Sequence, residues 1–179
     1  NSYVGAGGAV EGDYYVGGFT GRHSSGTISN SHSLADATGR DYIGGFIGEH
    51  DSGTIMNSYA TGDIDGDSWV GGFIGYQNGG DISDSYATGN VIATDYWVGG
   101  FIGTNSNGNI TDSYSTGNVT ADGSYVGGFI GEHQAGNITD SYSTGDVKAG
   151  YYDEDEEEFV YRESYVGGFI GYNNGGIIT

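Results

Sequence analysis

Short apolar runs alternate with glycine-containing turns along the whole chain. The runs are rich in Tyr, Val, Ile, Thr and Phe, which favour strands, and two of them recur, as at 110–116 and 125–130. Asn-Gly, Asp-Gly and Gly-Gly pairs between the runs are typical of turns. Because each glycine inside a helix would cost roughly 1 kcal/mol, the pattern predicts β-strands and argues against helices.

This pattern occurs in six consecutive repeats. Each copy begins with Asn-Ser or Asp-Ser and later contains an aromatic residue, Val or Ile, and Gly-Gly-Phe, and the copies cover 1–29, 30–56, 57–83, 84–111, 112–139 and 140–179. A unit of about 28 residues cannot bury its own apolar side, so neighbouring units must stack. The expected fold is all-β: one repeat domain over 1–179, built as a β-solenoid of six stacked repeats. A β-sandwich is the alternative, although it needs no constant period.

Stacking in register places equivalent residues in columns, with successive strands about 4.8 Å apart. The sequence predicts a Phe column, a Tyr/Trp column, an Ile column and a Tyr column, and each buried member would contribute about 1.5–3 kcal/mol. The Phe column is Phe19, Phe46, Phe73, Phe101, Phe129 and Phe169, and the Tyr/Trp column is Tyr15, Tyr42, Trp69, Trp97, Tyr125 and Tyr165. The Ile column is Ile28, Ile55, Ile82, Ile110, Ile138 and Ile178, and the Tyr column is Tyr3, Tyr59, Tyr86, Tyr114 and Tyr142, with His32 in the second copy.

A Gly-Gly pair separates the Tyr/Trp and Phe columns in every copy. Glycine weakens a strand unless something approaches its backbone closely. Under strict alternation, Tyr/Trp and Phe would share one face of the strand while Val and Ile took the other, so both faces would be apolar. Either the pair bends the strand and resets the alternation, or another wall or molecule covers the second face.

Composition narrows the class of protein. The chain has 38 Gly without a three-residue period, which excludes collagen, and 14% aromatic residues, which argue against disorder. It has no Cys, so neither disulfides nor thiolate metal sites contribute. The net charge of −20 repels nucleic acid and anionic membranes. No apolar run approaches the roughly 18 residues that span a bilayer, and the lack of a signal peptide indicates a mature product or an excerpt of a longer chain.

The segments 125–131 (Tyr-Val-Gly-Gly-Phe-Ile-Gly) and 140–147 (Asp-Ser-Tyr-Ser-Thr-Gly-Asp-Val) resemble the GLUG motif, a glycine-rich repeat of bacterial and archaeal surface proteins. The resemblance covers essentially the whole chain. It implies a β-solenoid-like stack that serves as a stalk or binding array in adhesin-like proteins. It supplies no catalytic residues.

Two sets of residues suggest metal chemistry. Alternating carboxylates with a glycine are typical of a Ca²⁺ loop, although the distant Glu is missing and an acidic turn is the alternative; they are Asp63, Asp65 and Asp67. The pair His23 and His50 could share a metal with Glu49, but Gln77, Asn105 and Asn173 replace His in other copies, so a solvated polar loop is expected there. A further column of Asp84, Asp112 and Asp140 is expected to cap the turns.

The last repeat contains an insertion at about 151–162, with six consecutive carboxylates. Such a run is usually solvated, but flanking aromatics could order a hairpin that makes a lateral contact; they are Tyr151, Tyr152, Phe159 and Tyr161. Three Asn-x-Thr sequons are possible glycosylation sites, at Asn109, Asn118 and Asn137.

Together these features predict a non-enzymatic extracellular protein at the cell surface, because no nucleophile–base set stands out. It would assemble with itself, head to tail, into a filament, sheath or adhesin stalk, without a cofactor other than possible calcium. The alternative is a binding module, either an adhesin array that recognises cell-surface glycans through exposed aromatics or an ice-binding solenoid that uses the Thr column (Thr61, Thr88, Thr116, Thr144).

Overall fold

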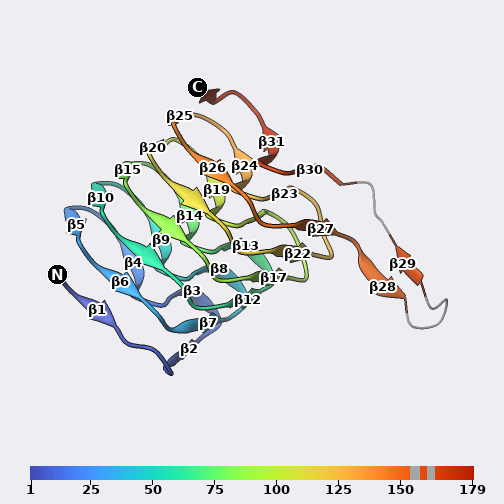
Figure 1. Cartoon of the computed structure of the whole chain (residues 1–179), viewed down its shortest axis with the longest axis horizontal. Coiled ribbons are helices and arrows are strands. Elements are labelled where there is room, and N and C mark those ends of the chain that lie inside the picture. Colours follow the sequence, from blue (N-terminus) through green and yellow to red (C-terminus); the bar gives the residue numbers. More distant parts are fainter. Residues whose placement is uncertain (154–157, 161–163) are drawn as a thin grey trace.

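The computed structural model describes residues 1–153, 158–160 and 164–179. Within these ranges the chain forms strands and turns but no helix. Five sheets of six strands each run along the molecule, and every repeat adds one strand to each sheet (Figure 1). The pairing within all five sheets is parallel, as between β10 and β15. The predicted β-solenoid is therefore confirmed, and a hairpin-built sandwich is excluded.

We number the sheets I to V in the order in which each repeat enters them. Sheet I contains β1 (Tyr3–Val4), β6 (His32–Ser33), β11 (Tyr59–Ala60), β16 (Tyr86–Ala87), β21 (Tyr114–Ser115) and β26 (Tyr142–Ser143). Sheet II contains β2 (Ala9–Glu11), β7 (Asp36–Thr38), β12 (Ile64–Gly66), β17 (Val91–Ala93), β22 (Val119–Ala121) and β27 (Val147–Ala149). Sheet III contains β3 (Tyr14–Gly17), β8 (Asp41–Gly44), β13 (Ser68–Gly71), β18 (Val98–Gly99), β23 (Val126–Gly127) and β30 (Val166–Gly167).

Sheet IV contains β4 (Thr20–His23), β9 (Ile47–His50), β14 (Ile74–Gln77), β19 (Ile102–Asn105), β24 (Ile130–His133) and β31 (Ile170–Asn173). Sheet V contains β5 (Thr27–Ser29), β10 (Thr54–Met56), β15 (Asp81–Ser83), β20 (Asn109–Thr111), β25 (Asn137–Thr139) and β32 (Ile177–Ile178). In addition, β28 (Tyr151–Asp153) and β29 (Glu158–Val160) form an antiparallel pair that projects from the side of the coil (Figure 1).

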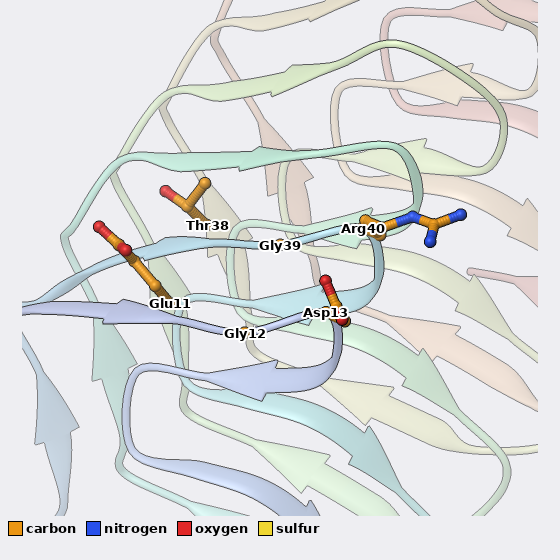
Figure 2. A pocket seen from close by; sticks show the side chains of 6 residues that line it. All are labelled: Glu11, Gly12, Asp13, Thr38, Gly39 and Arg40. Atoms are coloured by element: carbon orange, nitrogen blue, oxygen red, sulfur yellow. The ribbon is translucent and has the colours of Figure 1, made fainter.

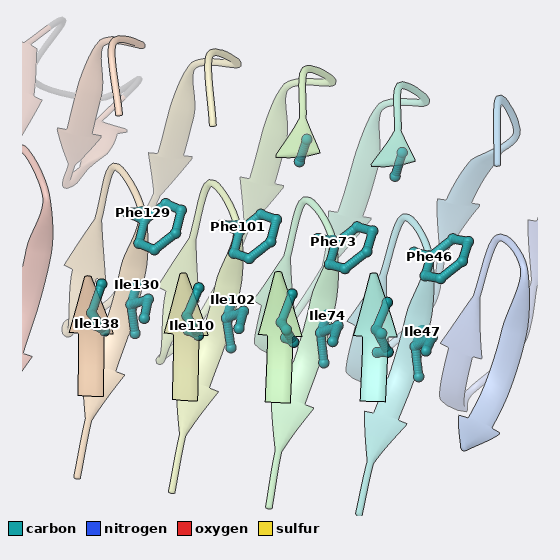
Figure 3. Packing of buried hydrophobic residues seen from close by; sticks show 14 residues of the cluster. Phe46, Ile47, Phe73, Ile74, Phe101, Ile102, Ile110, Phe129, Ile130 and Ile138 are labelled. Atoms are coloured by element: carbon teal, nitrogen blue, oxygen red, sulfur yellow. The ribbon is translucent and has the colours of Figure 1, made fainter. Parts of the chain in front are cut away.

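The coil encloses two separate cores. We call the coil formed by one repeat a rung. The first core contains the Phe column and the Ile residues of sheets IV and V, and in the inner rungs Phe46, Phe73, Phe101 and Phe129 are fully buried (Figure 3). The second lies between sheets II and III and contains Val70, Val98 and their equivalents. Each core is continuous along the stack because like residues lie in register, as Ile55 lies opposite Ile82 and Val70 opposite Val98.

The Gly-Gly pair explains why there are two cores. A Cβ on Gly71 would overlap the carbonyl oxygen of Ile74, and one on Gly72 would lie 3.1 Å from Cβ of Ala87 on sheet I. In the next rungs Ser115 of sheet I donates a hydrogen bond of 2.6 Å to the carbonyl oxygen of Gly128. At the Gly-Gly pair the coil is narrow, a feature that we call the waist, and the backbone of the pair contacts sheet I on the opposite side. Val before it points into one core and Phe after it into the other, so the pair bends the strand and resets the alternation.

This close approach predicts a position-dependent cost of adding a methyl group. Gly100→Ala would place Cβ against the carbonyl oxygen of Gly128, whereas the equivalent Gly168 has nothing within 4 Å of the added atom. We expect Gly100→Ala to lower the free energy of unfolding by about 1–3 kcal/mol, and Gly168→Ala to change it little. Urea denaturation of both variants checks this. Equal effects at the two positions would contradict the close packing of successive Gly-Gly pairs along the stack.

The Asn-Ser or Asp-Ser pair at the start of each repeat forms the corner between sheets V and I. The first residue adopts a left-handed φ of 47–52° in copies two to six, which Asn and Asp tolerate well. The serine makes the capping hydrogen bonds: Ser58 Oγ donates to the carbonyl oxygen of Met56 (2.9 Å) and accepts from the Ser31 N–H (3.3 Å). Asp84, Asp112 and Asp140 lie exposed at this corner.

Candidate functional site

The Tyr/Trp column lies on the outer surface, where sheet III begins. Neighbouring rings stack with centroid separations of 4.5–5.8 Å. The four inner residues are half-buried, while Tyr15 and Tyr165 at the two ends are 43% and 53% exposed. The predicted Tyr/Trp column is therefore present as a stack of rings on the surface, whereas the Phe column is core in every inner rung.

A left-handed backbone turns these aromatic side chains outward. The φ angle is 53–63° at five of the six positions, namely Tyr15, Tyr42, Trp69, Trp97 and Tyr125, and bulky residues rarely adopt this conformation. Glycines of sheet IV pack on the same backbone segment, since a Cβ on Gly75 would lie 2.7 Å from the carbonyl oxygen of Trp69. Because each ring covers the face of the next, the inner part of the column presents ring edges rather than faces to solvent.

A mixed column on sheet IV lies beside these rings. The Tyr76 ring meets Tyr42 edge-on at 5.9 Å, and the Tyr172 ring meets Tyr125 in the same way at 5.6 Å. Near the first rung, Arg22 pairs with Glu49 (3.2 Å) and Asp51 (2.9 Å). Burial raises the pKa of Glu49, and the Arg22 charge opposes that shift. Charged residues therefore recur along this column, which holds Arg22, Glu49, Tyr76, Thr104, Glu132 and Tyr172 in that order.

The Tyr column forms a second outward stack, on sheet I. Its centroid separations are 4.6–5.2 Å, with the His32 ring included between Tyr3 and Tyr59. The end residues Tyr3 and Tyr142 are 72% and 51% exposed. The Thr column runs beside it, with Thr88, Thr116 and Thr144 exposed. Both outer aromatic columns are therefore surface features that repeat once per rung.

The histidine column is not a solvated loop. His50, Gln77, Asn105 and His133 are fully buried, because the last position of each sheet IV strand points inward. Asn105 accepts a hydrogen bond from the Gly108 N–H (2.7 Å) and donates one to the Gly108 carbonyl oxygen (2.9 Å). These side chains cap the turn from sheet IV to sheet V from the inside, where water does not reach, so the sequence expectation is wrong.

His23 and His50 form a close pair in this column. Their rings stack at 5.0 Å, and their Nδ1 atoms lie 3.0 Å apart, so one Nδ1 must donate and the other accept. Burial, and secondarily the neighbouring His23, lowers the pKa of His50 to about 4. Nε2 of His50 is buried without a hydrogen-bond partner among the described residues. Protonation of this pair is therefore unfavourable in the folded state.

No metal-ligand set emerges from either group of candidates. Among the described residues, no three His, Asp or Glu side chains are arranged to hold a metal ion. Asp63 Oδ1 accepts from the backbone N–H of Asn90 (2.7 Å), Asp67 Oδ1 accepts from the Thr94 hydroxyl (2.7 Å), and Asp65 is exposed on β12. The three carboxylates thus bridge rungs or face solvent, and calcium binding by them stays a prediction.

The three sequon residues are exposed, and the side chains of Asn109 and Asn118 also form hydrogen bonds between neighbouring repeats. Asn109 Oδ1 accepts from the Asn137 N–H (3.1 Å), and its amide donates to Asp81 (2.9 Å). Asn118 Oδ1 accepts from the Asp146 N–H (3.0 Å). A glycan on Asn109 would therefore compete with a rung-to-rung hydrogen bond.

The insertion in the last repeat contains the backbone pairing of β28 with β29, in which Tyr151 lies opposite Val160 and Tyr152 opposite Phe159. Its predicted hairpin thus appears in the backbone. Tyr161 and the side chains of Tyr151, Tyr152 and Phe159 lie outside what the structure describes, so the lateral contact stays a prediction.

Shallow depressions mark the edge where sheet II turns into sheet III. One, of about 440 Å³, is lined by Glu11, Gly12, Asp13, Thr38, Gly39 and Arg40 (Figure 2). Arg40 already lies 3.8 Å from Asp67 and over the Tyr14 ring at 5.6 Å. A second depression, lined by Tyr96 and two residues of the Tyr/Trp column, was not anticipated from the sequence. The sequence could have indicated this depression, because the side chains at the position before that column differ in size from repeat to repeat. They are Tyr14, Asp41, Ser68, Tyr96, Ser124 and Ser164.

The fold and the surface together define the class of protein: a β-solenoid built from repeats, which is a structural or binding module. The family model described as the GLUG motif matches residues 39–65, 68–92, 97–120 and 122–148, which is more than half of the chain. The chain therefore belongs to the GLUG family, as its motifs indicated. Searches among curated proteins and solved structures found no match. The described residues contain no helix that could cross a membrane.

Proposed function

We propose that this GLUG solenoid is a non-enzymatic structural module of a cell-surface filament, sheath or adhesin stalk, and that copies of it stack end rung on end rung. The observation that carries the proposal is the exposure of apolar side chains in the two end rungs. They expose members of the columns that are buried in the inner rungs. Ile82 and Ile110 are 1% and 0% exposed, whereas Ile178 is 46% exposed. The extracellular location rests on the family resemblance and on the strongly acidic composition.

Among the strands that the structure describes, five at each end also have an unpaired edge. At one end these are β1 to β5, and at the other they are β26, β27, β30, β31 and β32. Open strand edges carry free N–H and C=O groups that pair readily with another strand. A second copy of the chain would satisfy both the backbone groups and the apolar columns.

The first rung of one copy can continue the columns of the last rung of another copy, so contact between unlike ends keeps like residues in register. Val16, Phe19 and Ile28 of the first rung occupy the columns that end in Val166, Phe169 and Ile178. A contact between unlike ends is heterologous, so it continues into a filament unless the rotation closes it into a ring. Alternative lateral association through the outer aromatic columns has less support, since stacked rings already cover most of one another's faces.

Sedimentation velocity and electron microscopy across a concentration series test this proposal. We expect the average mass to rise with concentration and the particles to be rods of variable length. Ile178→Lys should suppress this association, because it places a charge on the end face. Ile92→Lys is the matched control, since Ile92 is 53% exposed on the side of the coil, and it should associate like the parent. A monomer at high concentration, or equal suppression by both variants, would contradict end-to-end stacking.

A further inference from the structure

The Tyr/Trp column is regular except near its C-terminal end. Trp97 and Tyr125 are separated by 5.8 Å, whereas the other neighbours in the column are 4.5–5.1 Å apart. Tyr96 stands immediately before this wider step, with its ring inclined by 57° to that of Trp97 and 41% exposed. Here an aromatic side chain leaves the stack and lies beside it.

A hollow of about 650 Å³ opens next to Tyr96 and is lined by Tyr96, Ser124, Tyr125, Ser164 and Tyr165. It exists because a large side chain at the position before the column is followed in the next two rungs by serines. Its volume lies in the range of about 300–1,000 Å³ that is typical of small-molecule sites. The lining residues that the structure describes are all uncharged, although the chain carries a net charge of −20.

The walls of this hollow are held in place by further contacts. Tyr172 packs against Tyr125 at 5.6 Å and against Tyr165 at 5.0 Å, so it supports both rings from sheet IV. The Tyr165 N–H donates to Ser124 Oγ at 3.2 Å, which leaves the Ser124 hydroxyl proton free to donate in turn. Such positioning limits the side-chain entropy that a ligand would have to remove on binding.

We propose that this hollow binds a neutral saccharide. The ring of Tyr96, which lies outside the stack, offers an apolar face to the C–H groups of a pyranose, and Tyr and Ser hydroxyls exchange hydrogen bonds with its hydroxyls. An anionic ligand would be repelled by the acidic chain, and the described lining residues offer no carboxylate to bind a cation. The aromatic column outside the hollow lacks this chemistry, because its stacked rings show only their edges.

Saturation-transfer NMR and calorimetry with lactose, maltotriose, cellotriose and chitotriose test the proposal. The site variant is Tyr96→Ser, which introduces the residue that Ser68, Ser124 and Ser164 already supply at the same position, so the fold should tolerate it. The matched control is Tyr14→Ser, because Tyr14 occupies the equivalent position in the first rung, away from the hollow. Circular dichroism of each variant verifies that the coil is intact.

We expect at least one of these saccharides to bind the parent chain in the millimolar range or tighter. Tyr96→Ser should weaken that binding by at least about tenfold, the effect of losing a buried aromatic anchor, and Tyr14→Ser should leave it unchanged. If none of the four binds at millimolar concentration, or if binding survives Tyr96→Ser, the proposal is overturned. Since Ile178→Lys changes the end face and not the lining, it should bind like the parent, which separates this test from that of end-to-end stacking.

Discussion

Replacing Phe101 by Ala should lower the free energy of unfolding by about 3–5 kcal/mol, as for fully buried aromatics in general. Phe101 is completely buried, and its ring stacks between Phe73 at 4.9 Å and Phe129 at 4.8 Å. Its removal leaves a cavity in the middle of the continuous first core. Neighbouring strands are held in register by the backbone, so they cannot collapse to fill it.

Chemical denaturation of Phe101→Ala and of Phe169→Ala measures this effect. Phe169 occupies the same column in the last rung but is only partly buried, so its replacement should cost clearly less. A loss below about 1 kcal/mol at Phe101 would show that the column does not carry the core. A loss at Phe169 as large as that at Phe101 would contradict the assignment of the end rungs as open.

Acidification should destabilise the chain through the buried histidine column. Burial lowers the pKa of His50 to about 4 in the folded state, against the ordinary histidine value of 6.5. Between these two pH values the unfolded chain binds a proton that the folded chain does not, so the free energy of unfolding falls as the pH falls. The stability is complete above about pH 6.5, and roughly 3 kcal/mol is lost by about pH 4. His23 and His133 add to the effect, since burial lowers their pKa values too.

His50→Gln isolates this contribution. Gln77, at the same position one rung later, already caps the turn through hydrogen bonds to Gly79 and Gly80, so Gln at position 50 should keep the cap without the titration. Burial raises the pKa of Glu49 and Asp41, which acts in the opposite direction at acidic pH but equally in both proteins. Parent and variant should therefore have similar stability at pH 7. As the pH falls to 4, thermal or urea unfolding should show the variant becoming the more stable of the two, by roughly 3 kcal/mol. Parallel curves would refute the role of His50.

The sequons illustrate how a candidate modification site and a structural contact can use the same residue. The sequence indicates where a glycan or a lateral contact would be placed. The ladders from Asn109 to Asn137 and from Asn118 to Asp146 show that these side chains already have structural partners. The sequence pattern of a polar residue that recurs once per rung is thus the same whether its side chain stabilises the stack or binds a ligand.

The sequence by itself determined the repeat, the strand content, the parallel register and the Phe and Ile columns of the core. These follow from a period of about 28 residues, because a constant period with glycine turns can bury apolar residues only by stacking like on like. The family assignment followed from the same residues. Equivalent positions in successive copies, such as Phe73 and Phe101, therefore needed no three-dimensional information to be paired.

Only the tertiary structure decided which columns face inward. The Tyr/Trp column turns outward because the backbone at residues such as Trp69 and Trp97 is left-handed, and the His50 column turns inward because the next turn needs partners for its own polar groups. Both outcomes depend on how closely separate sheets approach at the glycines, which alternation within one strand cannot reveal. The hollow beside Tyr96 arises in the same way, from side chains of three different rungs that only stacking brings together.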